Sequence, residues 1–191
     1  AFLIVRRVTG EDQWKIIREE VKNEIRIQLA LERFDHRPRF GRLPLGLQQD
    51  VRALFSSYTA ACKEADDLLF SVGNMASVQE AMANSPVGKR TGNALYLHRD
   101  ALNEAPTLLR IYEGCARGYI GEIDGANVIK LRRDKPKVSY LAYPDFDKDP
   151  HPVLAHSTVV GLQSFKIKQQ DYKKSPTRYI LHRKEEFLTR S

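Results

Sequence analysis

Apolar side chains recur at helical spacing through most of the first half of the chain. The first series predicts an amphipathic helix, and Thr9 with Asp12 has the pattern of an N-cap at its start. A second series predicts a helix from residue 47 to residue 68, before Gly73 and Asn74 end it. The two series are Trp14, Ile17, Val21, Ile25 and Leu29, and then Leu47, Val51, Leu54, Tyr58, Ala61, Ala65 and Leu68.

Glycine and proline separate these helices from each other and from the rest of the chain. Residues 35–45 contain Pro38, Gly41 and Pro44 and are expected to form a loop. Residues 77–83 allow a short third helix, and residues 85–92 have the composition of a linker. We therefore expect residues 1–90 to form a helical subdomain.

The second half mixes strand and helix patterns. A short apolar strand is expected at 94–98, and a helix follows that carries Leu108, Tyr112, Cys115 and Tyr119 on one face. Turn signals at Asp124-Gly125 and at 134–136 indicate antiparallel strands at 128–132 and 138–143, with further strands at 158–160 and 165–168. The predicted fold class is α+β: two long N-terminal helices packed against a small, mostly antiparallel sheet with one further helix, in which residues 91–191 form the second subdomain.

Composition favours a protein without membrane spans and with polyanionic partners. No apolar run approaches the roughly 20 residues that a spanning helix needs. The net charge is +7, from 31 Lys and Arg against 24 Asp and Glu. The two cysteines are too few for a disulfide framework, so we expect a cytoplasmic location. The chain begins without Met, which suggests a piece of a longer polypeptide.

A basic pair of strands is the first candidate site. In residues 128–132, the side chains of Lys130 and Arg132 fall on one face of a strand and those of Ile129 and Leu131 on the other. One face can then be buried while the other meets phosphates. The candidate DNA-binding residues are Lys130, Arg132, Arg133, Lys135 and Lys137. A solvated sheet face that keeps an edge from aggregating is the alternative.

A proline-rich loop is the second candidate. It carries Tyr143, Pro144, Asp145, Asp147 and His151. Its carboxylates and imidazole can bind a divalent cation, which would make the segment a metal-dependent phosphodiesterase or nuclease. The spacing matches no established ligand signature, and the same residues are ordinary in turns, so a structural turn is the favoured interpretation and no metal site is assigned.

Several longer stretches resemble a known family. They are residues 1–10 (AFLIVRRVTG), 47–55 (LQQDVRALF), 109–117 (LRIYEGCAR), 125–131 (GANVIKL), 137–147 (KVSYLAYPDFD) and 180–185 (ILHRKE). Together they are similar to the C-terminal region of bacterial DNA phosphorothioation-associated methyltransferases.

The resemblance implies a protein of bacterial DNA modification and antiviral defence, of the restriction-modification kind. It also implies an S-adenosylmethionine-binding methyltransferase domain in a preceding part of the parent protein. No glycine-rich methionine-binding turn and no Asp-Pro-Pro-Tyr motif occurs in residues 1–191, so no cofactor is expected in this chain. The chain is then an accessory, non-catalytic region whose partners are that domain and DNA.

Three functions remain open from the sequence. In the first, the chain binds DNA, with the basic strands on phosphates and residues 143–151 probing the backbone or a base. In a refinement, Tyr143, Pro144 and Pro152 form an apolar rim for a phosphorothioate sulfur. The second is the metal-dependent phosphodiesterase built on Asp145, Asp147 and His151. The third is a non-catalytic scaffold for a partner subunit.

Overall fold

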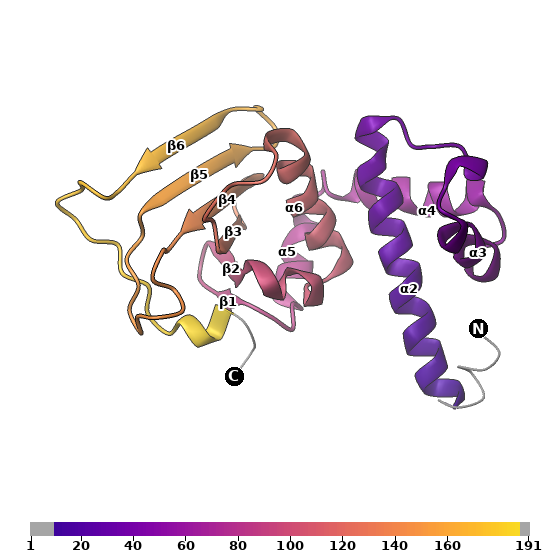
Figure 1. Cartoon of the computed structure of the whole chain (residues 1–191), viewed down its shortest axis with the longest axis horizontal. Coiled ribbons are helices and arrows are strands. Elements are labelled where there is room, and N and C mark those ends of the chain that lie inside the picture. The colour runs from indigo at the N-terminus through magenta and orange to yellow at the C-terminus, as the bar shows by residue number, and fades with distance from the viewer. Residues whose placement is uncertain (1–9, 188–191) are drawn as a thin grey trace. The chain divides into compact units, whose positions relative to one another are not determined.

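The computed structural model describes residues 10–187, and these form two compact units (Figure 1). The first unit extends to Phe70 and the second begins at Ser71. The boundary expected from the sequence lay at residue 90. It lies earlier because the helix at 75–83 buries Val78 and Met82 in the core of the sheet-containing unit.

The first unit is helical. Its elements are α2 (Glu11–Leu31), the 3-10 turns η1 (Glu32–Asp35) and η2 (Phe40–Arg42), α3 (Leu45–Leu54) and α4 (Tyr58–Ser71). The N-cap of α2 is Gly10, and Thr9, the expected cap, lies outside the described residues. The core of this unit contains Ile25 and Leu29 from the C-terminal half of α2, Val51 of α3 and Ala61 of α4, all of which are buried.

The second predicted helix is two helices in the structure. The chain leaves α3 at Phe55, whose backbone is extended, and α4 starts again at Tyr58. The hydroxyl Oγ of Ser57 accepts a hydrogen bond from the backbone N–H of Ala60 at 3.0 Å, as an N-cap does. The apolar spacing continues across the break, so periodicity alone predicted a single helix.

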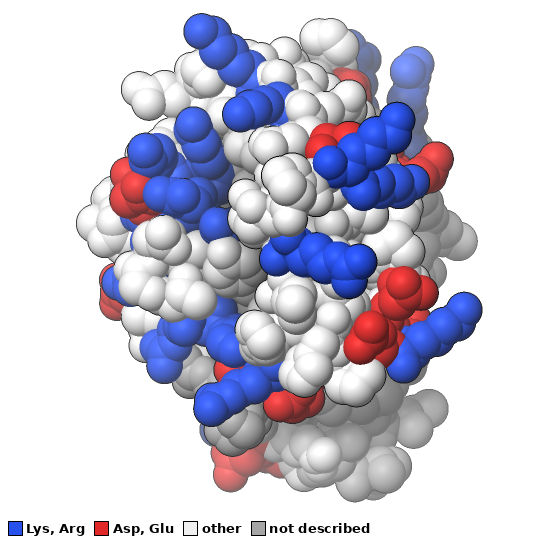
Figure 2. All heavy atoms as spheres, turned by 90° about the vertical axis from the view of Figure 1, so that its left-hand side faces the viewer, with Lys and Arg blue, Asp and Glu red and all other residues white. Residues whose placement is uncertain are grey.

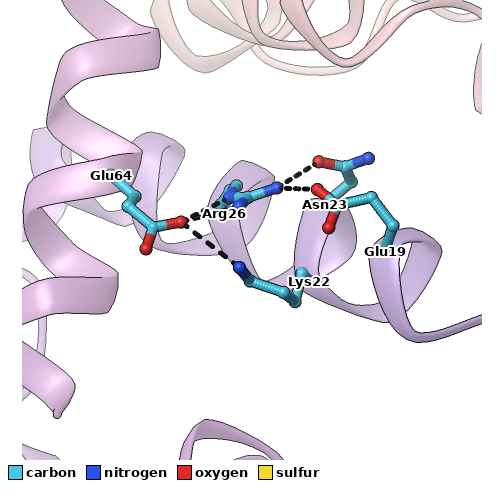
Figure 3. Close-up of polar contacts among 5 residues, drawn as sticks. All are labelled: Glu19, Lys22, Asn23, Arg26 and Glu64. Carbon is cyan, nitrogen blue, oxygen red and sulfur yellow. Dashed lines mark hydrogen bonds and ion pairs between the residues drawn. The ribbon is translucent and has the colours of Figure 1, made fainter. Parts of the chain in front are cut away.

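A polar network joins α2 to α4 beside this break (Figure 3). The guanidinium of Arg26 donates to Oε2 of Glu64 through Nε at 2.9 Å and Nη2 at 2.7 Å, and to Oδ1 of Asn23 at 2.8 Å. Lys22 approaches the same Glu64 oxygen at 3.8 Å. Both cations also lie over the ring of Phe55, the residue at which the chain leaves α3.

The second unit is built on a six-stranded antiparallel sheet whose strands follow one another in chain order. The α+β class is thus confirmed. The strands are β1 (Lys89–Arg90), β2 (Ala94–His98), β3 (Val128–Arg132), β4 (Lys137–Ala142), β5 (His156–Gly161) and β6 (Ile167–Asp171). The helical elements are α5 (Met75–Ala83), η3 (Arg99–Glu104), α6 (Thr107–Ile120) and η4 (Lys184–Phe187).

Helices α5 and α6 cover one face of this sheet (Figure 1). Leu95 and Leu97 of β2 and Ile129 and Leu131 of β3 are buried there with Tyr112 of α6. The alternation expected in β3 is confirmed, since Ile129 and Leu131 lie in this core while Lys130 and Arg132 are only partly buried.

The opposite face has a smaller apolar cluster at one end and is otherwise open. Val128 and Leu141 pack there against Phe146, Leu181 and Phe187. The last two come from the segment that follows β6, which is tied to the 152–154 segment by the bridge between Val153 and Ile180. The chain after β6 therefore returns across the open face and forms its wall.

Two turns depend on glycine. Gly125 has a φ of 73° in the turn before β3, as the Asp124-Gly125 signal predicts. Gly88 has a φ of 86°, and a Cβ there would lie 2.5 Å from the carbonyl oxygen of Tyr96. This close approach lets residues 89–90, expected as linker, pair with β2 as strand β1. No helix among residues 10–187 is long and apolar enough to cross a membrane.

Candidate nucleic-acid interface

A groove of about 740 Å³ lies on the open face of the sheet. We call it the sheet groove. Side chains of β1 to β5 form its floor, and the segment after β6 supplies Tyr172, Arg178, Tyr179 and His182. Every lining residue belongs to the second unit.

The register of the sheet places lysines along a single row of the floor. Directly paired residues on antiparallel strands point to the same face, so a chain of pairs marks one line across the sheet. That line runs through all six strands: Lys89, Tyr96, Lys130, Ser139, Val159 and Lys168. With strands about 4.8 Å apart, Lys89 and Lys130 stand roughly 10 Å from each other along it.

Lys130 is the central cation of this row. Its ammonium lies over the ring of Tyr96, 4.9 Å from the centroid. Among the described residues, neither Lys130 nor Arg178 has a carboxylate within ion-pair distance. Lys89 has one, at 3.1 Å from Oε2 of Glu186. No Asp or Glu is found among the described residues that line the groove, and its charged lining side chains are Lys89, Lys130 and Arg178.

The wider surface around the groove is also basic. Figure 2 shows Lys and Arg side chains spread over much of this side of the sheet, with Asp and Glu mostly toward its margins. The sequence after β5 is rich in cations: Lys166, Lys168, Lys173, Lys174 and Arg178.

Two of the predicted DNA-binding cations are engaged by an aspartate. Arg132 donates through Nε and Nη2 to the two carboxylate oxygens of Asp134, both at 2.7 Å, and Lys135 lies 3.8 Å from the same carboxylate. The hydrogen bonds from Arg132 lower the pKa of Asp134 to about 2. Asp134 therefore stays ionised and competes with any phosphate for this guanidinium.

The five predicted cations do not gather at one site. Lys130 is the one that lines the sheet groove. Arg132 and Arg133 line another cavity together with Asp134, Arg133 also lines a small one with Met82 of α5, and Lys137 is exposed at the start of β4. The loop that carries Arg132 and Arg133 is instead anchored by its backbone, since the carbonyl oxygen of Arg133 accepts from Nε2 of Gln79 at 2.7 Å.

The 143–152 loop forms a compact turn held by its apolar residues. Phe146 is buried, and the carbonyl oxygen of Asp145 accepts from the backbone N–H of Asp149 at 2.8 Å. Oδ1 of Asp149 accepts from the backbone N–H of His151 at 2.8 Å. Asp145 and Asp147 are exposed, and no group of three metal-ligating side chains occurs among residues 10–187.

The loop meets the sheet groove at two points. Tyr143 lines the groove but is only 5% exposed, and the His151 ring lies 5.2 Å from that of His182. Pro152 is buried while Pro144 is exposed. The three residues expected to form an apolar rim for sulfur therefore differ in exposure, and Pro144 is the one that solvent reaches.

Sequence reasoning missed most residues of the groove. Lys89 was predicted to lie in a linker, and Tyr96 was predicted only as part of a short apolar strand. Arg178, Tyr179 and His182 lie in a segment without regular periodicity, so no pattern placed them beside β3. The density of cations after residue 165 was the available signal.

A second, smaller cavity of about 190 Å³ lies on the helix-covered side of the sheet. Glu113 of α6 is 1% exposed there, and its Oε1 accepts from the hydroxyl of Tyr140 at 2.9 Å. Arg117 donates to the same carboxylate at 3.3 Å and also to Glu122. Burial raises the pKa of Glu113, and Arg117 opposes that shift only in part.

Comparison with protein-family models, with curated proteins and with solved structures found no match for this chain.

Proposed function

We propose that the second unit is a DNA-binding module and that DNA contacts it through the sheet groove. The observation that carries the proposal is the groove itself, where Lys89, Lys130 and Arg178 surround tyrosine side chains and no carboxylate is found among the described lining residues. Cations attract the phosphate backbone, and aromatic rings accept bases or sugars.

DNA is the chosen polyanion because of the sequence resemblance. The basic groove by itself suits any nucleic acid, and the similarity to phosphorothioation-associated methyltransferases favours DNA. On this proposal the chain positions DNA for a methyltransferase domain of the parent protein, and phosphorothioate-modified DNA is one of its substrates. Binding through phosphates releases counterions, so the affinity must fall steeply as salt rises.

Charge reversal inside and outside the groove tests the site. Lys130→Glu introduces a carboxylate at the centre of the lysine row, whereas Lys63→Glu makes the same change in net charge on the exposed surface of α4. We expect Lys130→Glu to weaken binding of a labelled DNA by at least tenfold and to flatten the salt dependence by more than about one unit of log–log slope. Lys63→Glu should leave both nearly unchanged.

A third variant should act in the opposite direction. Asp134→Asn releases the guanidinium of Arg132 and the ammonium of Lys135, and we expect tighter binding with a salt slope steeper by about one unit. Fluorescence anisotropy of matched modified and unmodified DNA across a salt series measures all of these effects. Absent binding at low salt, or equal losses in Lys130→Glu and Lys63→Glu, would contradict the proposal and favour the scaffold.

A further inference from the structure

We infer that the sheet groove binds an unpaired DNA strand, with a base stacked on Tyr179, rather than the backbone of an intact duplex. The inference rests on the proposed function and specifies which form of DNA the groove takes. It depends on three features: the difference in burial between the serines and Tyr179, the contacts that hold Tyr179, and the contact between Lys130 and Tyr96.

The groove places its polar floor below the wall formed by the segment after β6. Ser139 of β4 and Ser157 of β5 are buried, and Arg178 and Tyr179 line the same groove from the wall. A duplex presents phosphates on a wide convex surface and keeps its bases stacked inside. It can offer phosphates to Lys130 and Arg178 but keeps its bases away from the tyrosine rings, whereas a single strand can offer both at once.

Tyr179 has a fixed backbone and an accessible ring. Its carbonyl oxygen accepts from the N–H of Leu154 at 2.9 Å, and two residues later the N–H of Leu181 donates to Pro152 at 2.9 Å. The residue is nonetheless 48% exposed. The ring of Tyr172 meets it edge to face, with centroids 5.0 Å apart, which sets its orientation. A ring that is already ordered loses little entropy when a base stacks on it.

Tyr96 has a different role, because Lys130 already lies over its ring. The π face of tyrosine attracts the ammonium and holds it above the middle of the lysine row. Lys130 is thereby positioned for a phosphate, while the base of the same strand reaches Tyr179. Tyr96 therefore orients the ammonium of Lys130, and Tyr179 stacks on a base.

The test compares an unpaired oligonucleotide with the same sequence in a duplex, using the full chain. We expect tighter binding of the unpaired strand, and a loss of roughly ten- to a hundredfold for that strand in Tyr179→Ala. Tyr179→Phe should retain most of the affinity because it keeps the ring. Tyr119→Ala removes a tyrosine of similar exposure outside the groove and should bind as the parent does.

A gain-of-signal variant covers the case in which Tyr179→Ala does not fold. Tyr179→Trp keeps a stacking face, and its indole fluorescence should be quenched by the unpaired strand and not by the duplex. Preferred binding of the duplex, or full affinity in Tyr179→Ala, would overturn the inference while Lys130→Glu still tests the proposed function. Loss of all DNA binding in the unmodified chain would overturn both.

Discussion

Glu113 is an ionisable side chain in an almost fully buried position. Its carboxyl group is 1% exposed between α6 and the sheet, and its best hydrogen bond comes from the neutral hydroxyl of Tyr140. The cation nearby, Arg117, is 42% exposed and shares its donors with Glu122. Desolvation of the charged form therefore outweighs attraction to Arg117, and the pKa of Glu113 lies above the ordinary value for a glutamate.

The raised pKa of Glu113 predicts a pH-dependent stability. The folded state binds more protons than the unfolded state, so stability falls as pH rises from about 4.5 through the folded pKa, and it stays lower above that. Glu113→Gln removes this titration while its amide oxygen still accepts from Tyr140. We expect a flatter curve of the free energy of unfolding against pH, and higher stability than the parent at neutral pH.

Urea unfolding at a series of pH values measures this effect. Glu80→Gln alters an exposed carboxylate of α5, away from Glu113 and Arg117, and should keep the slope of the parent chain. Glu113→Leu leaves the Tyr140 hydroxyl only the longer contact to the backbone carbonyl of residue 113, at 3.4 Å, and should be about 1–3 kcal/mol less stable than Glu113→Gln. An unchanged slope in Glu113→Gln would show that the carboxyl titrates normally.

At the scale of elements, local patterns predicted strands better than connections. Strands 94–98 and 128–132 were placed correctly, the first from a short apolar run and the second from the alternation of Ile129 and Leu131 with Lys130 and Arg132. The break at 55–57 was missed because the apolar spacing continues across it, and strand β1 was missed because it depends on a contact distant in sequence. For β1 this contact is the pairing of Lys89 with Tyr96, which Gly88 permits. The groove wall at 172–182 shows no periodic pattern of apolar residues, and backbone hydrogen bonds to residues 152–155 hold it in position.

The break between α3 and α4 depends on a cap that a substitution can remove. Ser57→Ala eliminates the acceptor for the N–H of Ala60, and we expect the free energy of unfolding to fall by about 1 kcal/mol. Ser56→Ala changes the neighbouring exposed serine, which has no side-chain hydrogen bond among the described residues, and should have little effect. Chemical denaturation of the two variants in parallel measures the difference, and equal stability would argue that Ser57 does not cap α4.

At the scale of the whole molecule, a net charge of +7 predicted attraction to polyanions but not its location. Lys130 is separated from Arg132 and Arg133, which line a different cavity beside Asp134, the aspartate that binds Arg132. The groove instead combines Lys130 with Lys89 and Arg178, whose sequence positions span almost ninety residues. Only the strand register and the return of the chain after β6 bring them to one face.

The division into two units allows stability and binding to be separated by mutation. Glu64 is the carboxylate that joins α2 to α4, and all described residues of the sheet groove lie in the other unit. In Glu64→Ala, the guanidinium of Arg26 keeps its hydrogen bonds to Glu19 and Asn23. We expect the free energy of unfolding to fall by about 1–2 kcal/mol because the lost hydrogen bonds are charged but partly exposed.

DNA affinity should not follow this loss of stability. At temperatures where the chain stays folded, Glu64→Ala should bind DNA as tightly as the parent and as tightly as Asp67→Ala, which removes an exposed carboxylate of α4 without a side-chain partner among the described residues. Thermal unfolding followed by circular dichroism gives the stability, and anisotropy gives the affinity. A fall in affinity in Glu64→Ala but not in Asp67→Ala would place part of the DNA contact on the helical unit, because both variants change the net charge equally and differ only in the network around Arg26.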